Sequence, residues 1–325
     1  MINQEIRQKI KKIKIHTKRI MQNTLTGDYL SAFKGSGLEF DQIREYQMGD
    51  DVRAIDWNSS TKINKIMVKQ FIEERDRTVI LAIDVSGSTY FSSQKELRQE
   101  YIAQLAGTLA FIASANKDKV GALFFSDVIE AWIPPSRGNT HIGKIIETIF
   151  SIKPKKRGTN IADALRFLIG LKKRNAVVFM LSDWIEQSYD YTKLLKVAGC
   201  EYDFVGVRMI DATEQQMPDI GIFDLQDSET GATLTIDTRG ALLRSPSYEG
   251  QAGGFPLRPG GYGGQDEGQA AKATNPLNLF LHTRLAEQKK QFEKYKIDLL
   301  DLVVDRPFIN PLIQFFHQRI RRQIR

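Results

Sequence analysis

The feature that most constrains the fold is a regular alternation of short apolar segments with longer helical patterns from Thr78 onward. Segments such as TVILAID, KVGALFFS, AVVFMLSD and YDFVGVRMI are rich in β-branched and aromatic residues, and helical patterns such as ELRQEYIAQLAGTLAFIASA and IADALRFLIGLKK lie between them. Strands that alternate with helices in this way form a parallel sheet covered by helices on both faces. We therefore predict an α/β fold with Rossmann-type layering, built on a doubly wound, mostly parallel sheet.

Length and composition fit a globular protein with a sizeable core. The chain has 325 residues, of which 42% are hydrophobic. Its longest apolar stretch, AGTLAFIASA, is far short of the ~18 residues that cross a bilayer, and the N-terminus has no apolar signal core, so we expect a cytoplasmic protein. Cys200 is the single cysteine, which excludes an intrachain disulfide and a thiolate metal cluster. Any metal must therefore be bound by oxygen atoms or by the scattered histidines.

The net charge of +7 comes partly from the two ends of the chain, RQKIKKIKIHTKR near the start and HQRIRRQIR at the finish. In the first segment Ile6, Ile10, Ile13 and Ile20 recur near helical spacing among basic residues, which indicates a basic helix that packs by one face. Neither end carries interleaved aromatic residues or a DNA-reading motif, so we expect no nucleic-acid partner. Peripheral contact of the basic ends with a membrane surface stays the alternative to a solvated basic face.

We divide the chain into an N-terminal extension with a basic helix (residues 1–77), the core of the sheet domain (78–243), a Gly- and Pro-rich loop (244–275) and a C-terminal helix, strand and helix (276–325). Within the extension, KIMVKQFIEE predicts a strand. The segment GIFDLQDSETGATLTIDT predicts a hairpin with its turn at Glu229–Gly231. The composition of the loop cannot bury enough apolar area to offset chain entropy, so we expect it to be mobile.

A charged segment of the N-terminal extension mixes carboxylates with guanidinium groups: Asp50, Asp51 and Asp56 lie among Arg44, Arg53 and Arg75, beside Trp57. Charged groups are rarely buried unless they are paired. We expect the extension to pack on the sheet domain and this segment to form an ion-pair network that locks it there. A binding surface is the alternative.

A set of oxygen-bearing side chains follows the first strand of the predicted sheet. Asp84 ends that strand, and Ser86 and Ser88 follow it at a spacing of two. Thr159 precedes a later helix and Asp183 ends a later strand, so a parallel sheet would bring them to the carboxyl edge where such folds bind ligands. Carboxylate and hydroxyl oxygens are hard ligands that suit Mg²⁺, Mn²⁺ or Ca²⁺. We therefore predict a divalent metal site and expect Mg²⁺ in it.

The charges of this set suit a site that binds acidic side chains. Two carboxylates balance a divalent ion, and the hydroxyls add no charge, so an open coordination position could accept a carboxylate from another molecule. The alternative is structural, with Asp84, Thr159 and Asp183 capping the turns or helices that follow them. The joint placement of these residues favours the metal.

The same residues carry a resemblance to known families. DVSGS at 84–88, GT at 158–159 and SD at 182–183 are similar to the metal-ion-dependent adhesion site of von Willebrand factor A domains. Residues 35–88, from GSGLEF to DVSGS, resemble without a gap the signature of the bacterial domain-of-unknown-function family fifty-eight, whose members carry such a domain. The Gly-rich residues 245–275 look like an insertion that the family does not explain.

The resemblance implies a von Willebrand factor A-like fold, no known catalysis, and a metal bound by Asp84, Ser86, Ser88, Thr159 and Asp183. It also implies a MoxR-type AAA+ ATPase as a partner. In that case the protein is a non-enzymatic, chaperone-like adaptor in the remodelling or maturation of a client protein, and its metal site binds an acidic residue on one of its partners.

Two enzymatic or nucleotide-binding alternatives remain. A haloacid dehalogenase-like phosphohydrolase would use Asp84, but that chemistry needs a second Asp two residues later to donate the proton, and Ser86 stands there. The segment GNTHIGK at 138–144 follows the start of a P-loop pattern. It lacks the final Ser or Thr that holds Mg²⁺, and two prolines just before it are expected to break the strand that should lead into it.

Overall fold

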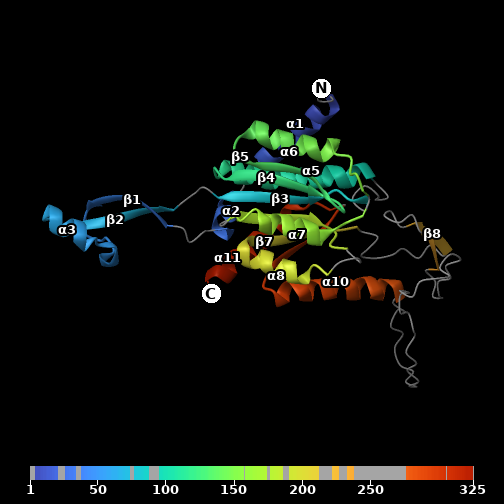
Figure 1. Ribbon diagram of the computed structural model, residues 1–325. Helices are drawn as coiled ribbons and strands as arrows, with labels where there is room; N and C mark the ends of the chain where they lie inside the picture. The colour runs from blue at the N-terminus through green and yellow to red at the C-terminus, as the bar shows by residue number, and fades with distance from the viewer. Residues whose placement is uncertain are drawn as a thin grey trace, which may run out of the picture.

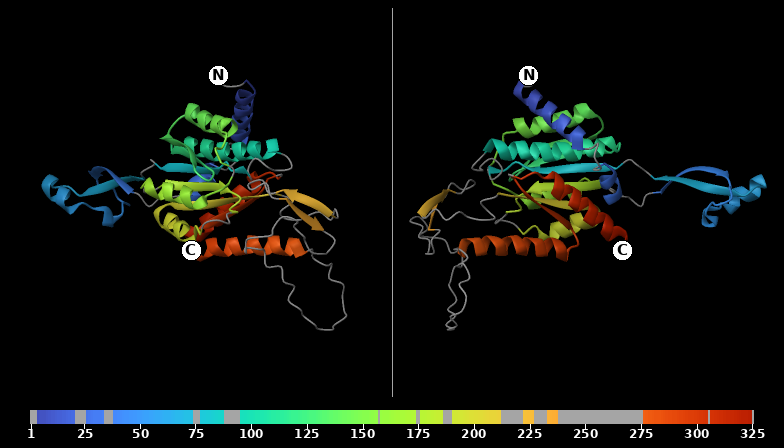
Figure 2. Two further views of the ribbon diagram at one scale, coloured as in Figure 1. Left: turned by 45° about the vertical axis from the view of Figure 1, so that its right-hand side comes forward. Right: turned by 180° about the vertical axis from the view of Figure 1, so that it is seen from behind.

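The computed structural model describes residues 4–20, 26–33, 38–73, 77–87, 95–156, 158–173, 176–185, 190–211, 222–226, 233–237, 276–304 and 306–324 of the chain. Its main body is a layered sheet domain, and a slender arm projects from one end of that domain (Figures 1 and 2). None of the described helices combines the length and the apolar character needed to cross a bilayer.

In the described part of the chain, the main sheet has six strands in the order β10-β7-β6-β3-β4-β5. They are β3 (Thr78–Asp84), β4 (Lys119–Phe125), β5 (Ile129–Ser136), β6 (Ala176–Ser182), β7 (Asp203–Ile210) and β10 (Asp298–Val303). Neighbouring strands are parallel except β5, which pairs antiparallel with β4. This order, in which the chain starts at the centre and winds to both edges, confirms the predicted doubly wound, mostly parallel α/β fold.

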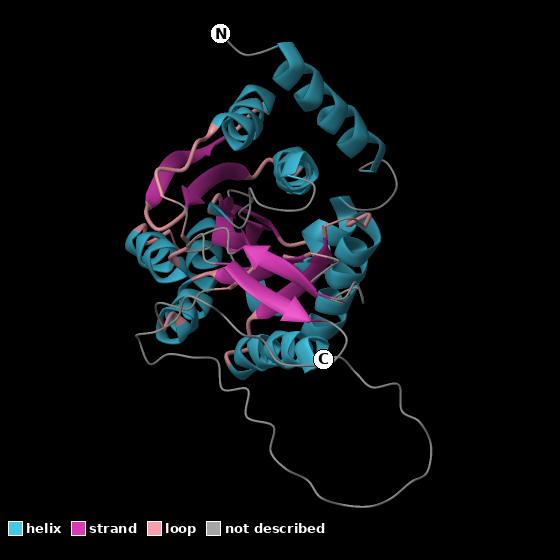
Figure 3. Cartoon of the chain, turned by 90° about the vertical axis from the view of Figure 1, so that its right-hand side faces the viewer, coloured by secondary structure: helices cyan, strands magenta, loops and turns pink. Residues whose placement is uncertain are grey.

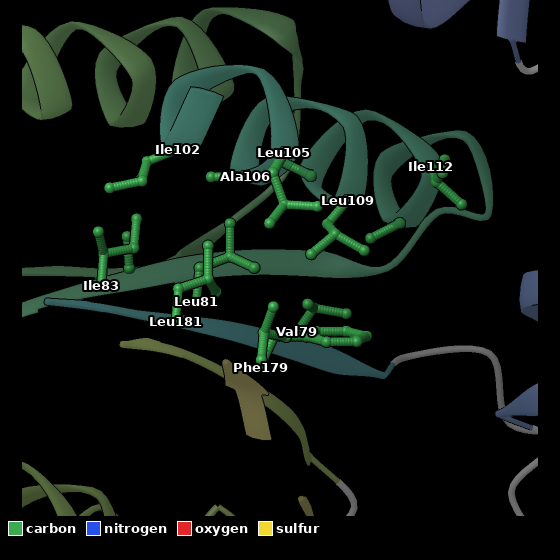
Figure 4. Packing of buried hydrophobic residues seen from close by; sticks show 14 of the residues in the cluster. Val79, Leu81, Ile83, Ile102, Leu105, Ala106, Leu109, Ile112, Phe179 and Leu181 are labelled. Atoms are coloured by element: carbon green, nitrogen blue, oxygen red, sulfur yellow. The ribbon is translucent and has the colours of Figure 1, made fainter. Parts of the chain in front are cut away.

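Helices cover both faces of the sheet, as the view along the sheet in Figure 3 shows. One face carries α1 (Gln4–Ile20), α2 (Thr26–Ala32), α5 (Lys95–Ala115), α6 (Asn139–Ser151) and α11 (Ile309–Ile324), and the other carries α7 (Ile161–Gly170), α8 (Thr192–Glu201) and α10 (Pro276–Lys294). Central strand β3 is apolar on both faces because both are buried. Val79, Leu81 and Ile83 face α5 (Figure 4), whereas Ile80 and Ala82 belong to the apolar core on the opposite face, which also contains residues of α7, α8 and α10.

Strand β5 departs from the expectation that its two prolines would break it. The strand runs through Pro134 and Pro135 to Ser136, because it lies at the sheet edge, where one side of the backbone needs no hydrogen-bond partner. Helix α6 then starts after Gly138, and His141 Nε2 lies 2.8 Å from the Val120 carbonyl oxygen. A P-loop needs a parallel strand that leads into its glycine, so the nucleotide-binding alternative gains no support.

The basic helix predicted near the N-terminus is α1, and it packs on the sheet domain by one face. Ile13 is buried and packs closely against Gly107 of α5. A Cβ atom added at Gly107 would lie 2.8 Å from Cγ2 of Ile13, so a larger residue would not fit there without a shift. Helix α2 is anchored by aromatic contacts of Tyr29 and Phe33 with Phe316. Arg319 of α11 donates a hydrogen bond to the last carbonyl of α2 and lies over the Phe33 ring, so both N-terminal helices belong to the sheet domain.

Residues 38–73 form the arm. Strands β1 (Leu38–Glu45) and β2 (Met67–Glu73) pair antiparallel, and η2 (Val52–Ala54) and α3 (Trp57–Ile63) lie between them in the chain. The predicted strand in KIMVKQFIEE is therefore confirmed as β2. Figures 1 and 2 show the arm extending away from the sheet domain, so the expectation that the whole extension packs on the sheet was wrong for residues 38–73.

The charged segment lies on this arm, and Asp50, Asp51 and Asp56 accept hydrogen bonds from other residues of the arm. Arg44 donates to both carboxylate oxygens of Asp50, at 2.7 and 2.6 Å, which lowers the pKa of Asp50. Asp51 and Asp56 accept hydrogen bonds from the backbone N–H groups that open η2 and α3. The expectation that an ion-pair network fixes the extension to the sheet domain was therefore wrong, because these carboxylates form hydrogen bonds within the turns of the arm. Arg75 lies outside the described residues.

A second small sheet follows β7. Strands β8 (Ile222–Gln226) and β9 (Thr233–Asp237) pair antiparallel with Gln226 opposite Thr233, which confirms the predicted hairpin. Its expected turn at Glu229–Gly231 and the Gly- and Pro-rich loop at 244–275 lie outside the described residues.

Candidate functional site

Asp84 is fixed at the carboxyl edge of the sheet by its own chain and by the neighbouring strand. It ends β3, the central strand, and its side chain is fully buried. Its Oδ1 accepts a hydrogen bond from the Ser86 N–H at 2.9 Å, and its Oδ2 accepts one from the Ser182 hydroxyl at 2.7 Å. Because Ser182 ends the adjacent parallel strand β6, the carboxylate is held between two strand ends.

Asp183 follows β6 directly and is the second buried carboxylate at this edge. Its Oδ1 accepts a hydrogen bond from the Ile185 N–H at 2.9 Å, and its Oδ2 lies 3.9 Å from Nη2 of Arg98, at the start of α5. Both side chains of this ion pair are almost completely buried. Sequence reasoning missed Arg98, although it shares a helix face with buried Ile102 and Leu105, and a cation on an apolar face signals a buried partner.

Thr159 reaches the same edge from the loop before α7, and its side chain is buried. The Asn160 N–H donates to the carbonyl of Ser126 at 3.0 Å, so this loop is tied to the end of β4. Phe125 of β4 pairs in register with Asp84, and the Val85 N–H donates to the Phe125 carbonyl at 2.8 Å. The end of β4 thus links the Thr159 loop to the end of β3.

The structure therefore gathers four of the predicted residues at the carboxyl edge of the sheet, and we call Asp84, Ser86, Thr159 and Asp183 the strand-end cluster. All four are buried. The fifth predicted residue, Ser88, lies outside the described residues, so its position relative to the cluster stays a prediction.

The electrostatics of the cluster favour a bound cation. The pKa of Asp84 is raised to about 6, first by burial and then by the negative charge of Asp183, while hydrogen bonds from Ser86 and Ser182 oppose this rise. When both carboxylates are ionised, two negative charges lie at the same buried edge of the sheet, and Arg98 pairs with that of Asp183. An isolated buried charge is costly, so a proton or a cation stabilises the cluster.

The chemistry of the donors fits a hard divalent cation, because carboxylate and hydroxyl oxygens are the ligands that Mg²⁺ and Ca²⁺ prefer. The described residues contain no group of three or more His, Cys, Asp or Glu side chains placed to bind a metal. A metal at the strand-end cluster would therefore depend on the hydroxyl groups as well as on Asp84 and Asp183.

A buried network fixes the backbone next to Asp183. Trp184 has a φ of 59°, an uncommon conformation for a residue with a side chain, and its ring is fully buried. Its carbonyl accepts a hydrogen bond from Nε2 of Gln288 at 2.7 Å, and Gln288 accepts one from Arg208. Arg208 also forms two hydrogen bonds to the Asp301 carboxylate. Helix α10 and strands β7 and β10 thus restrain the peptide that follows Asp183.

The phosphohydrolase alternative gains no support from this geometry. The position that should carry the second Asp is Ser86, which is fully buried and whose N–H donates to Asp84. A hydroxyl group cannot replace a carboxylic acid as the proton donor at neutral pH.

The chain also resembles known proteins. The family model described as "Protein of unknown function DUF58" matches residues 42–252. The uncharacterized protein Rv1480 of Mycobacterium tuberculosis is 25% identical over 235 residues, which cover 72% of this chain and 74% of that protein. The crystal structure of the conserved hypothetical protein BatB from Bacteroides thetaiotaomicron is 13% identical, with a TM-score of 0.40, over 75% of this chain and 98% of that chain. The SpRpn10 VWA domain is also 13% identical, with a TM-score of 0.32, over 41% of this chain and 75% of that chain.

Proposed function

The chain belongs to the DUF58 family of proteins of unknown function, and from this premise we propose that it is a non-enzymatic adaptor that binds protein partners through a divalent metal at the strand-end cluster. The observation that carries the proposal is the burial of two carboxylates, Asp84 and Asp183, at adjacent strand ends. Folding alone does not favour such a pair, because each buried charge costs free energy unless it is matched. A ligand-binding role explains why both are present.

In this proposal Asp84, Ser86, Ser88, Thr159 and Asp183 hold the metal, with Mg²⁺ expected and Mn²⁺ or Ca²⁺ as alternatives. The bound metal supplies an electrophilic position to which a partner's carboxylate can bind. Ser182 orients the Asp84 carboxylate through its hydroxyl group, and Arg98 balances part of the charge of Asp183. The network behind Trp184 keeps the Asp183 backbone in place.

The proposed partners are a MoxR-type AAA+ ATPase and a client protein that offers an acidic side chain. The protein would work in the cytoplasm, where the ATPase remodels or matures the client. One feature supports an adaptor over a phosphohydrolase: the residue that a phosphohydrolase would need two positions after Asp84 is a serine.

The experiment is affinity capture from native lysate in Mg²⁺ and in EDTA, with wild type, Asp84→Ala and Asp190→Ala as baits and mass spectrometry as the readout. Asp190 is a matched control, because it is an exposed carboxylate that accepts a hydrogen bond from the Thr192 N–H beside α8. We expect an AAA+ ATPase or client that wild type and Asp190→Ala hold only in Mg²⁺ and that Asp84→Ala does not hold. Identical partners for all baits in both conditions would contradict the proposal.

A further inference from the structure

Exposed apolar side chains collect on the arm. Among the described residues, the large apolar side chains that are exposed on the arm are Met48, Val52, Trp57, Ile63 and Ile66, whereas the sheet domain exposes two, Ile15 and Val197. The side chain of Met48 is completely exposed. Single exposed apolar residues are ordinary on protein surfaces, but a group of them on one projecting element marks an interaction surface.

The arm also lacks the support that a small sheet needs. Among the described residues, β1 pairs with β2 alone, so its second edge is open, whereas a bridge from Ile55 to Val68 covers the start of the second edge of β2. An isolated two-stranded sheet is marginally stable in water, and open strand edges are sites where another chain adds. The ion pair of Arg44 with Asp50 stabilises a turn of the arm, while the apolar side chains of the arm stay exposed.

A cavity of about 560 Å³ lies on the sheet domain near the root of the arm. Phe111 and Ala115 of α5 contribute its apolar lining, and Lys14, Lys117 and Arg137 contribute cations. Lys117 precedes β4, which starts beside the first residue of β3, and the arm enters β3 at that same end. The cavity thus lies at the end of the sheet opposite to the strand-end cluster. The arm projects from that same end of the sheet domain (Figures 1 and 2).

The charges of the two surfaces are complementary. Residues 38–73 contain seven Asp and Glu against five Lys and Arg, a net charge of −2. Because the whole chain carries +7, the remainder carries +9. Opposite net charges favour contact between the arm of one molecule and the body of another, whereas body-to-body contact brings like charges together.

We propose that the arm of one copy docks on the basic cavity of a second copy, and the reverse, in a two-fold symmetric dimer. Because the arm and the cavity lie at the same end of the molecule, a two-fold axis at that end places each arm against the other copy's cavity and closes the assembly. In this dimer Met48 packs against the apolar lining of the other copy's cavity, and the nearby carboxylate of Asp51 faces the basic side chains of that cavity. Trp57 and Ile63 are then covered by the second copy.

This dimer does not rest on the proposed metal function, since its surfaces lie at the other end of the sheet. Sedimentation equilibrium of the full chain, run in EDTA and in Mg²⁺, tests the dimer. The variant is Met48→Asp, and the matched control is Val197→Asp, at an exposed position on α8. We expect wild type and Val197→Asp to dimerise equally with and without metal, and Met48→Asp to raise the dissociation constant about tenfold or more. A monomeric wild type, equal dimerisation of both variants, or loss of the dimer in EDTA would overturn the proposal.

A charge exchange and a cross-link locate the contact. Lys14→Glu should weaken the dimer, and adding Asp51→Lys to it should restore part of the loss. In a Cys200→Ser background, Met48→Cys protein mixed with Ala115→Cys protein should form a disulfide-linked heterodimer on oxidation, while neither protein alone should do so. Failure of the charge exchange, or equal cross-linking in the unmixed samples, would exclude this arrangement.

Discussion

The strand-end cluster and the arm use polar and apolar groups in opposite ways. In the cluster, carboxylates are buried and each is fixed by a neighbouring element, as Asp84 is by Ser182 of β6. On the arm, carboxylates cap local turns and stay partly exposed, while apolar side chains such as Trp57 face solvent. Buried charge and exposed apolar surface are both unfavourable for an isolated chain. Each region therefore points to a binding partner, a cation for the first and a protein surface for the second.

The largest expected difference between the regions is in packing. Leu81→Ala should lower the free energy of unfolding by about 2–5 kcal/mol, because Leu81 is fully buried in the central strand and the change leaves a cavity. Ile63→Ala on the arm should change it by less than about 0.5 kcal/mol, because Ile63 is exposed. Urea unfolding in dilute protein measures both. Similar losses for the two variants would mean that the arm packs as part of the core.

The second difference is in the pH dependence of stability in EDTA. The pKa of Asp84 is about 6 in the folded chain, above its ordinary value of 3.8. Between these pH values the folded chain holds a proton that the unfolded chain has lost. The free energy of unfolding of wild type, relative to Asp84→Asn, should therefore fall by on the order of 3 kcal/mol from about pH 4 to pH 6 and then stay level.

Urea unfolding of wild type and Asp84→Asn at several pH values from 4 to 7.5 measures this change. A difference between the two proteins that does not vary with pH would show that Asp84 is ionised without cost in the folded chain. Asp56→Asn on the arm is the control. The pKa of Asp56 is lowered, mainly by its hydrogen bond from Ser59, so any contribution of this residue has the opposite sign and is lost as the pH falls.

A smaller effect is expected behind the cluster. Gln288→Ala removes two hydrogen bonds, the one to the Trp184 carbonyl and the one from Arg208. It should therefore lower the free energy of unfolding by about 1–3 kcal/mol. Gln318→Ala on the exposed side of α11 is the matched control and should be near neutral. Equal stability of the two variants would show that the network does not restrain this backbone.

The smallest effect is expected within the arm. Arg44→Ala removes the paired hydrogen bonds to Asp50, so the turn around Gln47 should open more often. Hydrogen exchange should become faster for backbone amides of the arm while those of β3 keep their protection. Faster exchange in β3 as well would mean that the arm and the sheet domain unfold together.

Local patterns predicted most of the sheet because its strands are buried on both faces. Apolar runs such as TVILAID and AVVFMLSD coincide with β3 and β6, and the oxygen residues at their ends followed from the geometry of parallel strands. Strand β5 was missed because proline normally breaks a strand, and the exception at a sheet edge depends on which strand has a free side.

The remaining features depend on which segments meet in space. The charged residues of the arm predicted ion pairs, but not whether those pairs reach the sheet domain or close on the arm itself. The contact of Arg98 with Asp183 joins residues far apart in the chain, and so does that of Gln288 with Trp184. Spacing in the sequence carries little information about such contacts, although an Arg among buried positions of a helix is a usable signal.

The most direct test of the central claim is calorimetric titration of Mn²⁺ into full-length wild type, Asp84→Ala and Asp190→Ala, each shown by circular dichroism to be folded. We predict that wild type and Asp190→Ala bind one ion per chain with similar affinity and that Asp84→Ala shows no binding at the same concentrations. Absence of binding to wild type, or equal binding to all three proteins, would contradict a metal site at the strand-end cluster.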